Sequence, residues 1–162
     1  MLGPLFAVFA QRIGGNILDI TGAWAVYLAA TGILMIYIGR IAGKKIALEK
    51  LLLAGYALNA LFTFGYLFVS SPSHLLLVQF GLGVAAALAV PPWSALYATS
   101  EKRDHAAYVW GLASGMYYVV TAVAVVLGGL IVNYFSFSTL FVTMGLIQIA
   151  ATLYQARILR YL

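Results

Sequence analysis

Long apolar runs, separated by short polar segments, divide the chain into six parts. Most of the runs are close to the roughly twenty residues that a helix needs to cross a bilayer. They lack the alternation of barrel strands, and a helix satisfies its own backbone hydrogen bonds in hydrocarbon. The pattern predicts an all-α polytopic membrane helix bundle. We expect one transmembrane domain over residues 1–162, with helices at about 2–10, 17–38, 51–69, 75–98, 106–132 and 139–155.

The first apolar run, over residues 2–10, is too short to span a membrane. At about 1.5 Å per residue it covers roughly half of the hydrocarbon core. We expect it to be the outer half of a helix whose beginning lies upstream of this sequence. The bundle would then contain five full transmembrane helices and a partial first one.

Basic residues occupy every second polar segment of the chain. Eight of the nine lie in these segments or at the C-terminus: Arg40, Lys44, Lys45, Lys50, Lys102, Arg103, Arg157 and Arg160. Cationic segments are retained on the cytoplasmic side of a membrane. The alternation therefore predicts a multi-pass protein of the cell (cytoplasmic) membrane with a cytoplasmic C-terminus.

Composition excludes a water-soluble domain. The chain is 64% hydrophobic and 8% charged, with a mean hydropathy of +1.02, whereas a soluble domain carries about a quarter charged residues. The net charge of +5 does not indicate nucleic-acid binding, because the cations lie at the ends of apolar runs. The lipid bilayer is the expected partner.

Catalytic and metal-binding classes find no support in the sequence. There is no cysteine, the two histidines lie far apart in polar segments, and the four carboxylates are not clustered. The glycines of Gly81–Ala86 half-match a dinucleotide fingerprint, but no strand precedes them. We therefore expect no enzyme, no cofactor and no metal site.

The polar segment after the second helix carries a recognisable motif, Gly39-Arg40-Ile41-Ala42-Gly43-Lys44-Lys45. It resembles the signature loop of the major facilitator superfamily, which has a glycine, an aliphatic residue, an alanine, an aspartate and then basic residues. Gly43 stands where the aspartate usually is. Gly128-Gly129, late in the fifth helix, resembles the end of the family's glycine-rich helix-five motif.

This resemblance implies one six-helix half of a transporter that moves a small solute by alternating access. The family usually places two such halves around a central cavity, so the expected partner is a second six-helix half or a second copy in a homodimer. The resemblance also implies a gating loop formed by Gly39, Arg40, Gly43, Lys44 and Lys45.

Polar and aromatic residues on three helices are candidates for the substrate cavity: Trp24, Thr31, Gln79, Ser114, Tyr117, Tyr118 and Thr121. The four on the fifth helix recur at helical spacing and share one face with Trp110. Tryptophan also favours the membrane interface, and Trp110 near the inner end is typical of such an anchor. A lone amide such as Gln79 also commonly bonds a neighbouring helix.

Two polar features at helix ends have a structural and a functional interpretation. Asp19 follows Gly14-Gly15-Asn16 and complements the dipole of a starting helix, or it belongs to an outer gate. Pro91-Pro92 removes two backbone donors from the fourth helix, so we expect a kink that is static or takes part in gating.

Two functional hypotheses follow. The first is a transport module, for which we expect a polar groove between the second, fourth and fifth helices. The second is a membrane scaffold or a degenerate half-transporter without a substrate, for which we expect a dry, apolar seam between helices.

Overall fold

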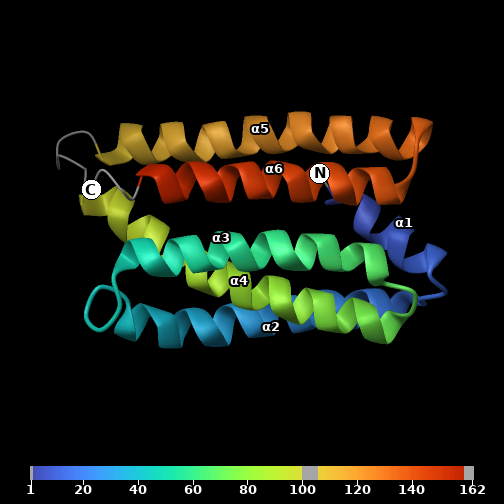
Figure 1. Ribbon diagram of the computed structural model, residues 1–162, viewed down its shortest axis with the longest axis horizontal. Helices are drawn as coiled ribbons and strands as arrows, with labels where there is room; N and C mark the ends of the chain where they lie inside the picture. The colour runs from blue at the N-terminus through green and yellow to red at the C-terminus, as the bar shows by residue number, and fades with distance from the viewer. Residues whose placement is uncertain (1, 100–105, 159–162) are drawn as a thin grey trace.

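The computed structural model describes residues 2–99 and 106–158, and helices that run along one long axis make up almost all of this part (Figure 1). In chain order they are α1 (Leu5–Arg12), α2 (Ile17–Ile41), α3 (Leu48–Gly65), the short 3-10 helix η1 (Tyr66–Phe68), α4 (Pro72–Thr99), α5 (Ala106–Tyr134) and α6 (Phe137–Ile158). No strand occurs within these residues. The predicted all-α bundle is confirmed.

Five helices in the described part are long and apolar enough to span a bilayer, namely α2, α3 with η1, α4, α5 and α6. Helix α1 has eight residues and is too short to do so. Several helices extend past the apolar runs: α2 continues to Ile41, α3 already begins at Leu48, and α6 reaches Ile158. These helices are longer than the apolar runs because Arg, Lys and Glu favour helix at the membrane boundary as well as in water.

The chain reverses direction at two ends of the bundle (Figure 1). The turn between α2 and α3 lies at the same end as the C-terminal end of α6, and the other described turns lie at the opposite end. We call the first of these the basic end, after its described cations Arg40, Lys44, Lys45, Lys50 and Arg157. Arg12 is the one described cation at the opposite end. Lys102, Arg103 and Arg160 lie outside the described residues.

The turn between α2 and α3 is tightly hydrogen-bonded. The amide of Gly43 donates to the Ile46 carbonyl at 2.9 Å, and the amides of Lys44 and Lys45 donate to the Ile41 carbonyl at 3.2 and 3.0 Å. Gly43 adopts a φ of 74°, in the left-handed region. A residue without a Cβ reaches this region at little cost, which explains why the motif here carries glycine.

Replacing Gly43 with alanine is expected to lower the free energy of unfolding by about 1–2 kcal/mol, because a Cβ is strained at positive φ. The nearest side-chain atom to that Cβ would be 3.6 Å away, so steric overlap adds little. Unfolding of the protein in lipid bicelles measures the effect. The control is Gly39→Ala, whose Cβ would have no atom within 4 Å. Equal losses in both variants would contradict the assignment to backbone strain.

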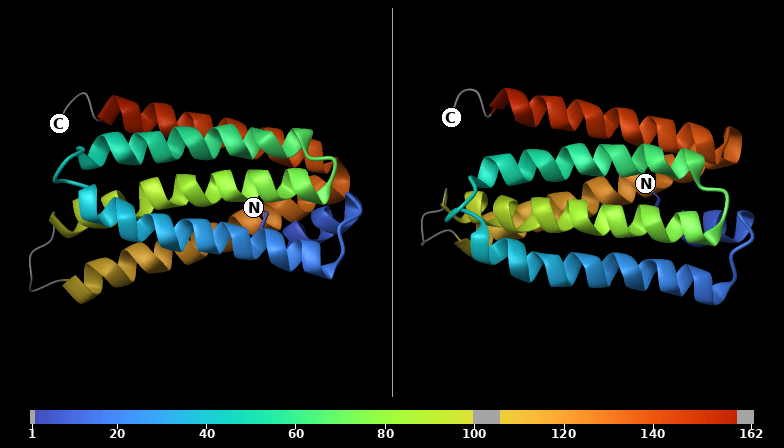
Figure 2. Two further views of the ribbon diagram at one scale, coloured as in Figure 1. Left: turned by 90° about the horizontal axis from the view of Figure 1, so that it is seen from below. Right: turned by 60° about the horizontal axis from the view of Figure 1, so that its bottom comes forward.

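Helix α4 is the most enclosed helix of the described bundle and lies between α2 and α3 (Figure 2). Two glycines allow the close approach. A Cβ built on Gly83 would lie 2.8 Å from the Tyr27 carbonyl oxygen of α2. A Cβ on Gly55 of α3 would lie 2.8 Å from the Ala89 amide of α4. Small residues at helix crossings are the usual means of close packing in membranes.

Helix α4 continues through Pro91 and Pro92 without being broken. Because proline has no amide hydrogen, the carbonyls of Ala87 and Leu88 lack their usual helical donors. Pro92 is fully buried, and Val90 beside the pair lines a partly open cavity between α3, α4 and α5. The loosened turn therefore lies in the cavity wall.

Buried aromatic rings hold the short helix α1 in place. The Phe9 ring lies 4.9 Å from Phe141, 5.3 Å from Phe137 and 5.9 Å from Tyr66, measured between centroids. Tyr66 stacks on Phe141 at 4.9 Å. All four side chains are buried. This aromatic cluster joins α1, η1 and α6 near the end opposite the basic one.

Candidate functional site

A cavity of about 470 Å³ lies between α3, α4 and α5, in the half of the bundle nearer the basic end. Its volume falls in the range of roughly 300–1,000 Å³ that is usual for small-molecule sites. The lining residues are Leu52 and Tyr56 from α3, Ala89, Val90, Trp93 and Ser94 from α4, and Trp110, Ala113, Ser114, Tyr117 and Tyr118 from α5.

Helical spacing explains why these residues share one space. The five from α5 recur every three or four positions, so they lie on one face of the helix. The two from α3 are four residues apart, and those from α4 are two adjacent pairs one turn apart. One stripe of each helix thus faces the cavity.

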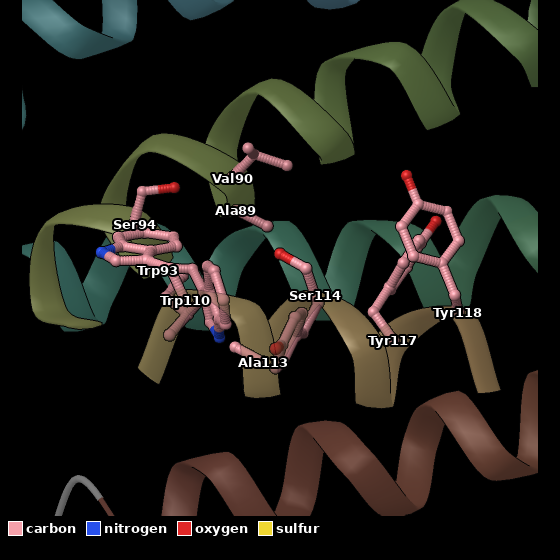
Figure 3. Close-up of a pocket in the computed structure, with 11 residues that line it drawn as sticks. Ala89, Val90, Trp93, Ser94, Trp110, Ala113, Ser114, Tyr117 and Tyr118 are labelled. Carbon is pink, nitrogen blue, oxygen red and sulfur yellow. The ribbon is translucent and has the colours of Figure 1, made fainter. Parts of the chain in front are cut away.

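The two ends of the cavity differ in construction. Figure 3 shows Trp93 and Trp110 at one end, the tyrosines of α5 at the other, and Ser114 between them. The two indoles meet edge to face at 6.3 Å. Tyr97 stacks on Trp93 at 5.1 Å and meets Trp110 at 5.1 Å. The Tyr97 hydroxyl donates to the Val109 carbonyl at 3.2 Å, which links α4 to α5 at this end.

The tyrosine end is more open. The rings of Tyr117 and Tyr118 contact each other at 5.4 Å, edge to face, and their side chains are 66% and 70% exposed. Edge-to-face packing is a preferred arrangement of aromatic pairs. The pair therefore forms a wall of the cavity that remains accessible from outside the bundle.

The walls provide groups for binding. Hydroxyl groups donate and accept hydrogen bonds, and indole nitrogens only donate. Among the lining residues that the structure describes, none is a carboxylate, a histidine, a lysine or an arginine. Within residues 2–99 and 106–158, no three His, Asp or Glu side chains lie close enough to share a metal ion. The cavity can hold a solute by packing and hydrogen bonding.

Three of the predicted cavity residues, Ser114, Tyr117 and Tyr118, line this cavity. Thr121 lies one turn further along α5 and is not among the lining residues. Gln79 of α4 is only 2% exposed, but it too lies outside the lining set. The structure therefore brings together the first part of the predicted α5 stripe and leaves its end outside.

The two predicted residues of α2 are also separate from the cavity. The Thr31 hydroxyl donates to the Tyr27 carbonyl at 2.7 Å and to the Gly83 carbonyl of α4 at 3.3 Å. Trp24 stacks on Tyr27 at 5.3 Å and contacts Phe6 of α1. Both therefore fix α2 against its neighbours. The cavity lies between α3, α4 and α5 and has no lining residue from α2, so it is not the groove expected between the second, fourth and fifth helices.

Several cavity residues were missed or interpreted differently from the sequence. Tyr56, Trp93 and Ser94 were not proposed, and Trp110 was interpreted as an interfacial anchor. The signal available for Trp93 was its spacing of four residues from Tyr97, directly after the proline pair. For Tyr56 we find no signal in the sequence, since it is one aromatic residue in an apolar helix.

Comparison with known proteins supplies the family. A family model described as Major Facilitator Superfamily matches residues 1–161. The chain belongs to the Major Facilitator Superfamily. No curated protein and no solved structure matches it. With the family shown, the spanning helices make this a multi-pass membrane protein of transporter-type fold, and helices α1 to α6 fit one six-helix half.

The segment that resembles the superfamily's signature loop, residues 39–45, forms the tight turn at the basic end. Arg40, Lys44 and Lys45 are exposed there, and Gly39 lies in the last turn of α2. Where the superfamily usually has an aspartate, Gly43 supplies a left-handed backbone. A role of these residues in gating stays a prediction.

Asp19, the candidate for an outer gate, forms a capping box at the start of α2. The Asn16 side-chain oxygen accepts from the amides of Leu18 and Asp19 at 2.8 and 3.0 Å. The Asp19 carboxylate accepts from the Asn16 amide at 2.9 Å. Three backbone donors at the helix end thus find acceptors in these two side chains. The gating role of Asp19 stays a prediction beside this structural one.

Replacing Asn16 with alanine is expected to lower the free energy of unfolding by about 1 kcal/mol, because the amides of Leu18 and Asp19 lose their acceptor. Asn16→Asp keeps an oxygen in place and serves as the control. Equilibrium unfolding in bicelles compares the two variants. If alanine and aspartate behaved alike, the side chain would not act as a cap.

Proposed function

We propose that the chain moves a small solute across the membrane by alternating access and is not an enzyme. The observation that supports this most is the aromatic and hydroxyl-lined cavity between three spanning helices of a Major Facilitator Superfamily fold. Its volume suits a small molecule, and part of its wall is open. A membrane scaffold has no need of such a space.

The proposed transporter contains a second six-helix half or a second copy of this chain. Surfaces on α2 and α5 support this arrangement. A Cβ built on Gly22 or Gly32 of α2, or on Gly111 or Gly115 of α5, would have no atom within 4 Å. Open faces of small residues allow another helix to approach closely.

We further propose that the protein lies in the cell membrane with its basic end in the cytoplasm. Cationic loops favour that side. Because the chain has no cysteine, single cysteines report their own location. Lys45→Cys at the basic end and Ser73→Cys at the opposite end replace exposed residues. An impermeant maleimide should label only the second in intact cells. Labelling of both, or of Lys45→Cys alone, would contradict the orientation.

Solute flux tests the proposed function. Cells that carry or lack the gene are compared for uptake and efflux of a solute panel, and a responding solute is then measured with variants. Replacing both Tyr117 and Tyr118 with phenylalanine removes two hydroxyls and should lower flux roughly three- to tenfold. The control Tyr134→Phe changes an exposed tyrosine of α5 outside the cavity. If flux of no solute depends on the gene, the scaffold hypothesis replaces transport.

A further inference from the structure

We infer that the cavity binds a flat aromatic solute that has no net charge and carries oxygen atoms that accept hydrogen bonds. This inference rests on the proposed function and names its substrate class. It is carried by the aromatic side chains around the cavity, by the absence of Asp, Glu, His, Lys and Arg among the described lining residues, and by the positions of the hydroxyl groups.

Aromatic surface dominates the cavity wall. Five of the eleven lining residues are aromatic: Tyr56, Trp93, Trp110, Tyr117 and Tyr118. The indoles are held by contacts with each other and with Tyr97, so their positions are fixed before a solute arrives. Aromatic rings prefer offset stacked and edge-to-face partners. A planar ring system between the indole end and the tyrosine end can make such contacts at both ends.

Charge distinguishes between solutes of similar shape. A buried ion without a partner is strongly disfavoured, and no lining side chain in the described part of the chain carries an opposite charge for it. Helix α3 carries one carboxylate, Glu49, three residues before the lining residue Leu52. Glu49 is not among the lining residues. Lys45 and Lys50 flank it in the sequence. An organic anion that left these cations would meet no cation among the described lining residues.

Hydrogen-bonding groups set the polarity of the solute. Ser94 from α4 and Ser114, Tyr117 and Tyr118 from α5 bring hydroxyl groups to the lining, and the Trp93 indole can contribute an N–H donor. Figure 3 shows Ser114 between the two aromatic ends. The described lining side chains include no carboxylate, so every hydrogen-bonding group among them can donate. Carbonyl or hydroxyl oxygens on the solute match this set.

A series of probes with one ring system and different charges tests the inference. The probes are hydroxymethylanthracene, anthracene carboxylate and anthracenylmethyl trimethylammonium. They are titrated into the full chain in nanodiscs of phosphatidylcholine, with quenching of tryptophan fluorescence as the readout. The chain has three tryptophans, and Trp24→Phe leaves only the two in the cavity. The neutral alcohol should bind saturably and at least about tenfold more tightly than either ion.

Matched substitutions on α5 separate cavity binding from partition into lipid. Ala113→Phe fills the cavity and should abolish saturable quenching, whereas Ala122→Phe adds the same ring to an exposed position outside it and should not. Thermal unfolding checks that both variants are folded. If Ala113→Phe fails to fold, Ser114→Leu takes its place and should weaken binding of the alcohol at least about fivefold.

Four results would overturn the inference: tighter binding of the cation, tighter binding of the anion, quenching that ignores the cavity substitutions, and no binding of any probe. These results are distinct from failure of the proposed function. If no probe binds but gene-dependent flux of another solute is measured, the substrate class is wrong and transport stands. If the alcohol binds as expected but no flux depends on the gene, transport is wrong.

Discussion

Replacing Gly83 with leucine is expected to lower the free energy of unfolding by more than about 3 kcal/mol, beyond the usual cost of an overpacked site. The reason is that the backbones of α2 and α4 touch here. A Cβ on Gly83 would lie 2.8 Å from the Tyr27 carbonyl oxygen and 2.9 Å from the Ala30 Cβ. A flexible side chain could turn away, but these atoms cannot, so α2 must separate from α4. Unfolding in bicelles and the yield of monodisperse protein measure the loss.

Gly32→Leu is the matched control for this substitution. Gly32 lies on α2, close in sequence to the crossing, but a Cβ there would have no atom within 4 Å. The isolated chain should therefore keep its stability in this variant. Gly55→Leu repeats the test between α3 and α4 and should resemble Gly83→Leu, because a Cβ on Gly55 would meet the Ala85 carbonyl at 2.9 Å. Similar losses at Gly32 and Gly83 would show that the helices do not meet as described.

The bundle could be predicted from the sequence because hydropathy along a chain reports membrane crossings directly. Helix ends were less predictable. Glu49 and Lys50 appeared to belong to a loop, yet they form the first turn of α3. Hydropathy marks where hydrocarbon ends, but a helix continues wherever its residues favour it. The third crossing likewise ends in the 3-10 helix η1, and hydropathy does not distinguish a 3-10 helix from an α-helix.

The candidate site was predictable on one helix only. Residues 114, 117 and 118 were identified because helical spacing places them on one face of α5. Spacing does not reveal which helix that face meets. Tyr56 completes the cavity from α3, whereas α2 turns toward α4 instead. The neighbours of a face depend on the glycine crossings, which are tertiary features.

Polar residues within a span also proved to be a weak guide to the site. Four described threonine hydroxyls donate to carbonyls one turn back in their own helix: Thr21 to Ile17, Thr31 to Tyr27, Thr143 to Thr139, and Thr152 to Gln148. Such bonds satisfy a hydroxyl without any ligand or neighbouring helix. The composition of the cavity wall is therefore more informative than the count of polar residues in each helix.

Replacing Phe141 with alanine is expected to lower the free energy of unfolding by about 3 kcal/mol. Among substitutions that shorten a side chain, we expect this one to have the largest effect. The Phe141 ring is 2% exposed and lies 4.9 Å from both Phe9 and Tyr66. In a bilayer the unfolded helix keeps its apolar side chains in lipid, so the loss comes from packing contacts and from the cavity left behind. Unfolding in bicelles measures it, and α1 should be the first part to detach, because Phe9 holds it to this ring.

Phe68→Ala provides the comparison, since the Phe68 ring is 80% exposed and can face lipid in both states. We expect a change below about 0.5 kcal/mol there, as for surface substitutions in general. Hydrogen exchange of the α1 amides adds a local readout. Faster exchange in Phe141→Ala, with no change in Phe68→Ala, would show that the aromatic cluster keeps α1 in place. Unchanged exchange in both variants would mean that α1 is held by its connection to α2 and not by the rings.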